Sequence, residues 1–146
     1  MLPILEKIHE KGNYSPTRKD VRRWHGILNQ IIFGGIVPKF RNIEIKKVPG
    51  QFAAVLPKKK KKTKERYADL EIDTEFEDFK SFIMILAHEM IHAWQWINFE
   101  KMPHGKTFFQ WKEKLAEQEI PLNIKYAKKN MFADAIKSLD IPKTTC

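Results

Sequence analysis

The sequence predicts an α+β fold: an N-terminal helix, then a small three-stranded antiparallel sheet, then a long helix and further helices. Apolar residues recur at helical spacing through residues 17–33 and again through residues 75–98, whereas residues 43–73 contain short segments in which apolar and polar residues alternate. The chain of 146 residues shows no internal repeat and no second unit, so we expect residues 1–146 to form one domain.

Helical patterns open the chain. Apolar residues at helical spacing favour a short helix over residues 2–11. Thr17 is suited to be the N-cap of a second helix, because its hydroxyl can accept a hydrogen bond from the first turn. We expect that helix to end at Gly34 and Gly35, before Pro38.

The middle of the chain contains three candidate strands, at residues 43–48, 51–56 and 67–73. The third is the clearest, because its apolar residues share one face and its carboxylates the other. Short connections between the strands favour an antiparallel sheet with one face in solvent. The second connection, residues 58–66, is so rich in lysine that we expect an exposed hairpin loop there.

The second half of the chain is helical in pattern. Thr74 and Glu77 have the spacing of a capping box, and we expect the long helix that follows to run over about residues 75–98. Two further helices are expected over about residues 104–118 and, with a weaker pattern, residues 128–139.

The long helix carries the pattern HExxH at His88, Glu89 and His92. Because an α-helix turns about 100° per residue, side chains four apart point the same way, one turn apart. Two imidazoles so placed can share a Zn²⁺ ion, and the glutamate beside them can take a proton from a water molecule. The pattern therefore indicates a zinc-dependent peptidase, although two buried histidines bonded to backbone carbonyls are the alternative.

A catalytic zinc ion needs three protein ligands and an open position. His104 is the leading candidate for the third ligand, because it follows a helix break that lets the chain fold back. Glu113 is the competing candidate, while Asn98 stands where one class of zinc peptidases has its third histidine. We expect His9 and His25 to be structural or surface residues.

The net charge of +9 is unevenly distributed: residues 1–66 carry 17 Lys/Arg and 5 Asp/Glu, whereas residues 67–146 carry 10 and 13. A basic half is typical of a polyanion-binding surface, with DNA as the natural candidate, although it can also serve only solubility. The residues that we expect to contact nucleic acid lie in the hairpin loop and on the second helix: Lys58, Lys59, Lys60, Lys61, Lys62, Lys64, Arg66, Arg22 and Arg23.

The cysteine count and the hydropathy limit the kinds of site and the cellular location that we expect. Cys146 is the only cysteine, which excludes an intramolecular disulfide and a cysteine-only zinc site. No apolar run is long enough to span a membrane, and the first residues do not resemble a secretion signal. We expect an intracellular protein (cytoplasmic, nuclear or nucleoid-associated), not secreted, with a monomer favoured.

The segments HEMIHAW and, after a short stretch, PHGKTF resemble the SprT-like metalloproteases, including the Spartan DNA–protein crosslink proteases, whose pattern is HExxH followed by HGxxF or HGxxW. Residues 28–38, LNQIIFGGIVP, are similar to a further segment of that family, so the resemblance covers roughly residues 17–118. It implies a zincin-like α+β fold, zinc bound by His88, His92 and His104, and Glu89 as the general base.

The resemblance also implies protein substrates attached or close to DNA, and hence a role in DNA repair. Many family members append a cysteine-rich zinc ribbon, which one cysteine cannot build, so we expect a minimal protease domain. An extended peptide could bind beside an edge strand, for which residues 67–73 are a candidate. Tyr67 and Tyr126 are candidates for stabilising the oxyanion.

Two other functions remain open from the sequence. One is a nucleic-acid-binding protein with a structural or non-catalytic zinc site, and the other is a metallohydrolase that acts on bonds other than peptides. Glu89 argues against the first of these, because a structural zinc site has no need of a general base.

Overall fold

The computed structural model describes residues 12–137, so the short helix expected over residues 2–11 lies outside the described residues. The described elements, in chain order, are α1 (Arg18–Ile31), β1 (Ile43–Ile45), β2 (Ala53–Lys59), β3 (Arg66–Ile72), α2 (Phe79–Phe99), α3 (Lys106–Phe109), α4 (Lys112–Glu117) and α5 (Met131–Ile136). The mixed α+β content and the order of elements agree with the sequence prediction.

Helix α1 begins where its capping residue predicts. The Thr17 hydroxyl accepts a hydrogen bond from the backbone N–H of Asp20 (3.1 Å), and the Asp20 carboxylate accepts one from the backbone N–H of Thr17 (3.0 Å). Past its end, Gly34 and Gly35 have φ angles of 65° and 81°, a left-handed conformation that glycine adopts without strain. The chain therefore turns away from the helix at the expected position.

The sheet has the strand order β1-β3-β2, with β3 in the middle. Strands β2 and β3 form an antiparallel hairpin, whereas β1 pairs in parallel with β3. The prediction of a fully antiparallel sheet is therefore wrong, and so is the prediction that residues 67–73 form an edge strand. The physical reason is the connection from β1 to β2: residues 46–52 are long enough to pass the end of β3 and start β2 on its far side.

Strand β2 is an edge strand, which explains why it continues through Pro57 to Lys59 rather than ending at Pro57 as the sequence predicts. Proline has no backbone N–H, and an edge strand tolerates it because one side of the strand has no neighbour to receive a hydrogen bond.

Helix α2 begins at Phe79, four residues later than expected, and its N-cap is Asp78, whose carboxylate accepts a hydrogen bond from the Ser81 N–H (2.8 Å). The predicted capping box of Thr74 and Glu77 is therefore wrong. Phe76 is held in an extended bridge to Tyr14 (N–O distances 2.7 and 2.9 Å), which prevents the helix from starting earlier.

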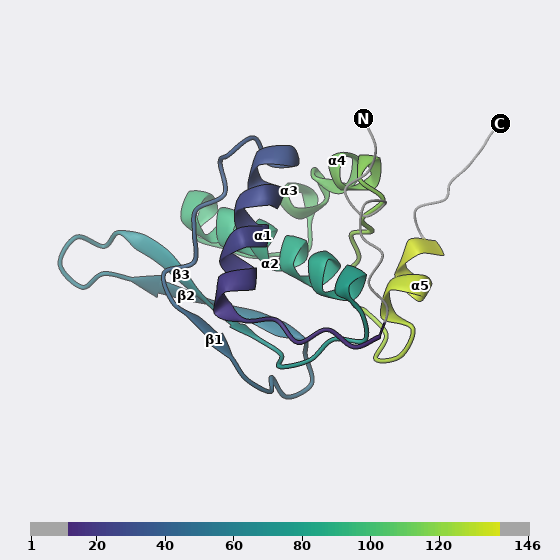
Figure 1. The fold of residues 1–146 in the computed structure, drawn as a ribbon. Coiled ribbons are helices and arrows are strands. Elements are labelled where there is room, and N and C mark those ends of the chain that lie inside the picture. Colours follow the sequence, from purple (N-terminus) through teal and green to yellow (C-terminus); the bar gives the residue numbers. More distant parts are fainter. Residues whose placement is uncertain (1–11, 138–146) are drawn as a thin grey trace.

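The segment after α2 forms two short helices, α3 and α4, in place of the single helix expected to about residue 118, and α5 lies within the expected range 128–139. Helix α2 crosses the middle of the molecule, where it packs on β2 and β3 and against α1 (Figure 1). Phe33, Phe40, Phe76, Phe82 and Phe108 are among the largest fully buried side chains.

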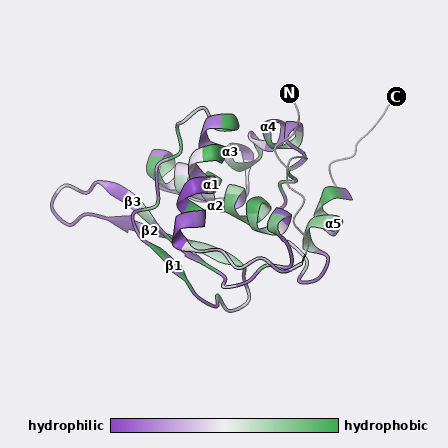
Figure 2. Ribbon diagram, viewed as in Figure 1, coloured by the Kyte–Doolittle hydropathy of each residue, from purple (hydrophilic) through white to green (hydrophobic). Residues whose placement is uncertain are grey.

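The hydropathy of the elements follows their positions. Helix α2 is largely hydrophobic, whereas the far end of the β2–β3 hairpin, which projects from the body, is hydrophilic (Figure 2). No helix in residues 12–137 combines the length and the apolar composition needed to cross a lipid bilayer.

Candidate metal centre

Three polar side chains lie in the buried middle of α2. His88, Glu89 and His92 are 6%, 7% and 8% exposed, and the apolar residues beside them are buried as well. Burying ionisable groups in an apolar helix is costly unless they have partners. Their partners come from the segment after α2, from β2 and from the loop before α5.

His104 completes a cluster of three histidines. Helix α2 ends at Phe99, the φ of 60° at its C-cap Glu100 turns the chain back, and His104 lies just before the start of α3. The Nε2 atom of His92 is 3.2 Å from that of His88 and 3.1 Å from that of His104, and the remaining pair is 3.3 Å apart. The structure thus brings together the three histidines that the sequence singled out as ligands.

The spacing of these nitrogens fits one small metal ion. Zinc–nitrogen bonds of roughly 2.0–2.1 Å at tetrahedral angles place two ligand nitrogens about 3.3–3.4 Å apart. The three observed distances, 3.1 to 3.3 Å, are close to that value. His104 is exposed while the other two are buried, so one side of the cluster faces solvent.

The environment keeps these imidazoles neutral, as metal binding requires. Burial, with a smaller contribution from the neighbouring histidines, lowers the pKa of His88 to about 3. Burial likewise lowers the pKa of His92 to about 4, against the hydrogen bond that His92 donates to Gln95, which favours the charged form. Burial also lowers the pKa of His104.

The outer ring nitrogens of the two buried histidines have partners. His88 Nδ1 lies 3.3 Å from the Tyr126 hydroxyl, whose oxygen also accepts a hydrogen bond from the Asn123 N–H (3.0 Å). His92 Nδ1 lies 2.8 Å from Oε1 of Gln95. Such contacts fix the orientation of each ring, with Nε2 facing the cluster.

Gln95 is a residue that the sequence reasoning missed. It is fully buried, and its side-chain nitrogen donates to the carbonyl oxygen of Pro103 (2.8 Å) and to the hydroxyl of Thr107 (2.9 Å). The signal that could have revealed it is an uncharged polar residue in an apolar helical run, three positions after His92 and therefore on the same side of the helix.

Glu89 points from α2 towards the edge strand β2. Burial raises the pKa of its carboxyl group to about 8, and a hydrogen bond with the backbone of Val55 has the opposite, smaller effect. A cation at the neighbouring histidine cluster would lower this pKa again, because it stabilises the carboxylate form.

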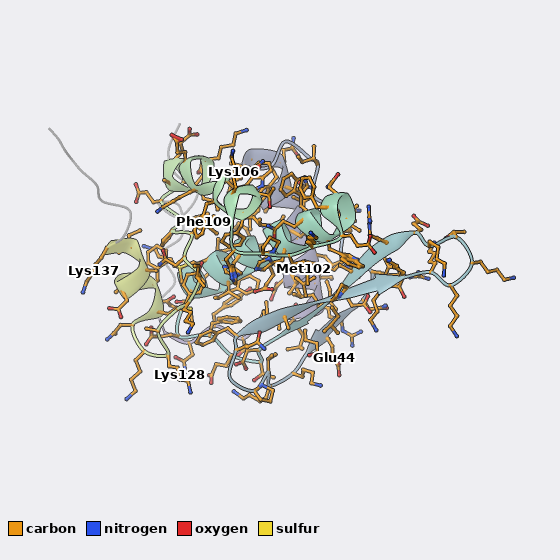
Figure 3. All side chains as sticks on the ribbon, turned by 180° about the vertical axis from the view of Figure 1, so that it is seen from behind. Glu44, Met102, Lys106, Phe109, Lys128 and Lys137 are labelled. Atoms are coloured by element: carbon orange, nitrogen blue, oxygen red, sulfur yellow. The ribbon has the colours of Figure 1, made fainter. Side chains whose placement is uncertain are left out.

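A cleft of about 680 Å³ opens beside the three histidines. One wall is the start of β2 with the preceding turn, and the other is the loop before α5. The lining residues are Gly50, Gln51, Phe52, Ala53, Ala54, Val55, Ile85, His88, Glu89, His92, Met102, His104, Ile124, Lys125 and Tyr126. Met102, in the segment between α2 and α3, is labelled near the middle of the view from behind, with Lys128 and Lys137 at the α5 end (Figure 3).

The competing ligand candidates lie elsewhere. Within residues 12–137, the cluster able to hold a metal consists of His88, His92 and His104, and Glu113 is an exposed residue of α4 outside it. His25 is buried and contacts the carbonyl oxygen of Pro38 (3.1 Å), a structural environment like the one expected. His9 lies outside the described residues.

Of the two tyrosines considered for the oxyanion, Tyr126 lines the cleft. Tyr67 lies in β3, where the Arg41 guanidinium covers its ring at 4.7 Å, and it is not among the residues that line the cleft. Tyr126 therefore remains the candidate with access to a bound substrate.

The basic residues singled out in the sequence gather at two places. Those of residues 58–66 form the end of the β2–β3 hairpin, where Lys59 and Arg66 form ion pairs with Glu100 at the end of α2, and Lys60 pairs with Glu65 (3.0 Å). Within residues 12–137, the exposed side chains of Lys58, Lys61, Lys62 and Lys64 form no salt bridge.

Arg22 and Arg23, the two arginines of α1 singled out in the sequence, differ in their contacts. The Arg22 guanidinium donates to the carbonyl oxygens of Phe40 (2.6 Å) and Arg41 (3.3 Å), which fastens the loop before β1. The Arg23 guanidinium lies over the ring of Trp24, 5.7 Å from its centre. Contact of either residue, or of the hairpin, with DNA stays a prediction.

Comparison with protein-family models agrees with the resemblance noted in the sequence. No curated protein matches the chain as a relative. A family model, that of the SprT-like family, matches residues 23–128, which include the whole sheet, the HExxH helix and His104. Because the match spans most of the sequence and contains the complete histidine cluster, the chain belongs to the SprT-like family.

Proposed function

We propose that the protein is a zinc-dependent endopeptidase. The single observation that carries this proposal is the convergence of three histidine Nε2 atoms, 3.1 to 3.3 Å apart, beside the buried carboxyl group of Glu89 in an open cleft. Three neutral imidazoles with one open side are a donor set typical of catalytic zinc, and membership of the SprT-like family supports the same metal.

Each residue of the centre has a defined role in this proposal. His88, His92 and His104 would hold the zinc ion, which when bound activates water and polarises the scissile carbonyl group. Glu89 accepts the proton of the attacking water and passes it to the leaving amine. Its position between α2 and β2 suits this role, because the cleft in which a substrate would lie is bordered by both elements.

The edge strand β2 is the natural docking site for the substrate. Its first residues, Ala53 to Val55, line the cleft, and its outer side has no neighbouring strand among the described residues. An extended peptide can add to such an edge through main-chain hydrogen bonds, which depend little on side-chain identity. We therefore expect broad sequence tolerance.

We extend the proposal to substrates that are bound or crosslinked to DNA. The hairpin that carries the exposed lysines is continuous with the cleft wall: from Val55 to Lys59 the strand advances four residues, or roughly 13 Å. DNA held at the hairpin would thus place an attached protein within reach of the cleft. The basic first half of the chain supports this reading.

The deciding experiment is the substitution Glu89→Gln, which removes the base and keeps a side chain of similar volume. We expect the purified variant to retain one zinc ion per chain and to lose cleavage of a DNA-bound protein by a factor of roughly 10²–10⁴. Glu113→Gln, at an exposed position of α4, is the matched control and should cleave normally. Unchanged cleavage by Glu89→Gln would contradict the mechanism.

The same assay separates the alternative function. A nucleic-acid-binding protein with a structural zinc site would retain zinc in the wild type but cleave nothing, with or without DNA. The buried Glu89 carboxyl beside the histidines counts against that alternative, since a structural site gains nothing from a buried acid.

A further inference from the structure

The side chain of Gln95 connects two parts of the histidine cluster. Gln95 is fully buried in α2 and uses both ends of its amide: the oxygen contacts His92 Nδ1 at 2.8 Å, and the nitrogen donates to Pro103 O at 2.8 Å and to Thr107 Oγ1 at 2.9 Å. All of these distances are those of well-formed hydrogen bonds. The contacts reach His92 on the helix and both sides of His104 in the returning segment.

The partners leave only one orientation of the amide group. The carbonyl oxygen of Pro103 can accept a hydrogen bond but cannot donate one, so the NH₂ group of Gln95 must face it. The amide oxygen must then face His92, and this oxygen can only accept. The Nδ1 atom of His92 is therefore the protonated nitrogen of the ring.

This assignment fixes the state of the opposite ring nitrogen. A neutral imidazole with its proton on Nδ1 has a free lone pair on Nε2. In His92 that lone pair is directed at the Nε2 atoms of His88 and His104, which lie 3.2 and 3.1 Å away. His92 is thus held in the tautomer that a metal ligand needs, before any metal binds.

The nitrogen end of the amide acts on the third histidine. Pro103 directly precedes His104, and Thr107 lies in the first turn of α3, so the two hydrogen bonds flank His104 on both sides. His104 is exposed and lies on the short segment that connects α2 to α3. Anchoring this segment to the helix one turn after His92 reduces the freedom that a metal would otherwise have to remove.

We propose that Gln95 is the positioning residue of the metal centre: it sets the tautomer of His92 and fastens the His104 segment to α2. This inference rests on the proposed metal-binding function. It assigns Gln95 no contact with the substrate or with the reacting atoms. A buried amide that only satisfies its own hydrogen bonds would contribute to folding but would not control the state of His92.

The test begins with the metal-free wild-type protein. Long-range ¹H–¹⁵N NMR spectra distinguish the two imidazole tautomers, and we expect His92 to be in the Nδ1–H form. A His92 signal in the Nε2–H form would overturn the proposal without any variant being made.

Three variants then separate the two ends of the amide. Gln95→Met keeps the volume but removes every hydrogen bond, and we expect a mixture of His92 tautomers and a loss of zinc affinity of roughly 10–100-fold, measured by competition with a chromophoric chelator. Gln95→Glu keeps an acceptor oxygen and should restore the Nδ1–H form. Thr107→Val removes one anchor of the His104 segment and should leave the His92 tautomer unchanged while zinc affinity falls several-fold.

The control is Asn98→Leu, one turn farther along α2, where the side chain bonds only to the Trp94 carbonyl oxygen in the described structure. It should change neither readout, and circular dichroism should show that each variant is folded. A folded Gln95→Met protein with an unchanged tautomer and unchanged zinc affinity would overturn the positioning role. Failure of the wild type to bind zinc at all would instead overturn the proposed function.

Discussion

The middle of α2 and the β2–β3 hairpin are the two chemically distinctive regions of the molecule, and they are built in opposite ways. The histidines of α2 are buried, and both ring nitrogens of His88 and His92 have a defined neighbour. The hairpin lysines are exposed and Arg66 is half-buried, and those that form ion pairs do so with Glu65 or Glu100 at the surface. Buried groups need specific partners, whereas exposed charges are satisfied by water.

This difference explains why the two regions support conclusions of different kinds. Geometry alone narrows the function of the buried cluster, because few ligands other than a metal ion suit three converging nitrogens. Geometry does not narrow the function of the hairpin, because exposed lysines suit any polyanion. Substitutions in the first region should therefore have large and specific effects, and those in the second should have small effects that depend on salt.

The largest effect is expected from loss of a metal ligand. His104→Ala should lower zinc affinity by more than the roughly 10–100-fold typical of losing an outer hydrogen-bond partner, yet leave the metal-free protein as stable as wild type because His104 is exposed. His92→Ala should cost affinity and also about 1–3 kcal/mol of stability, since it leaves the buried oxygen of Gln95 without its donor.

Zinc titrations and urea unfolding measure the two effects separately. His25→Leu is the matched control: it also removes a buried histidine, but one that contacts Pro38 and is not part of the cluster. It should destabilise the protein and leave zinc affinity unchanged. Equal zinc affinity of wild type and His104→Ala would show that the third ligand is wrongly assigned.

The second prediction concerns how the stability of the metal-free protein depends on pH. The folded-state pKa values of His88 and His92, about 3 and about 4, lie below the unfolded value of 6.5, so the unfolded chain binds more protons below pH 6.5. The folded-state pKa of Glu89, about 8, lies above the unfolded value of 4.5. The folded chain therefore binds one more proton than the unfolded chain between these two pH values.

Together these shifts place the maximum of stability near neutral pH. Below it the histidines, among them His25 and His104 with pKa values lowered in the same direction, outweigh Glu89, and stability falls as the pH falls. Above it Glu89 dominates, and stability falls as the pH rises towards 8. The limb above the maximum should have a slope of about 1 kcal/mol per pH unit, measured by urea unfolding in the presence of a chelator, and the limb below it should be at least as steep. In Glu89→Gln the decline above the maximum should disappear, and its persistence would show that another group causes it.

The sequence predicted the features that depend on local spacing. Four-residue spacing on a helix places His88 and His92 together whatever surrounds them, and the break before His104 allowed the return of the chain. Gln95 was missed because its role depends on the Pro103 carbonyl oxygen, which only the folded loop brings into reach. The sequence shows that residue 95 carries an amide group, but it does not show which groups the amide contacts.

The fold shows the same division. Alternating residues revealed the strands, but the strand order depends on where residues 46–52 cross the sheet, which no local pattern states. The start of α2 was misplaced for a similar reason: Thr74 and Asp78 both have capping side chains, and the bridge between Tyr14 and Phe76 decides between them.

The third prediction tests the hairpin as a DNA-binding element. Replacing its exposed lysines without salt bridges by glutamine should weaken DNA binding and make the slope of log affinity against log salt shallower, by about 0.9 for each phosphate that the variant no longer neutralises. The residues to change are Lys58, Lys61, Lys62 and Lys64. Cleavage of a DNA-free peptide and thermal stability should not change.

The control for this series is the pair Lys128→Gln and Lys137→Gln, at the α5 end of the molecule (Figure 3).

In the wild type, DNA should stimulate peptidase activity, and the stimulation should fall as salt is raised, because bound phosphates release counterions. Equal activity with and without DNA at every salt concentration would show that the basic residues 1–66 do not couple DNA binding to peptidase activity.

The smallest effect is expected at Glu100, where the two regions meet. Its carboxylate sits at the end of α2 and pairs with Lys59 and Arg66, and the Lys59 ammonium group lowers the pKa of that carboxyl group. Glu100→Gln should release Lys59 for a phosphate and raise DNA affinity a few-fold at low salt, with the gain vanishing at high salt. Arg66 should respond less, because it also donates to the Ile97 carbonyl oxygen (3.1 Å).

The comparison variant is Glu113→Gln, which removes the same charge from an exposed position outside the hairpin. If both variants raise DNA affinity equally, the gain comes from net charge and not from the release of Lys59. If only Glu100→Gln does so, the carboxylate at the end of α2 limits how strongly the hairpin binds DNA. In that case DNA binding by the exposed hairpin depends on the C-cap residue of α2, the helix that carries the buried histidines.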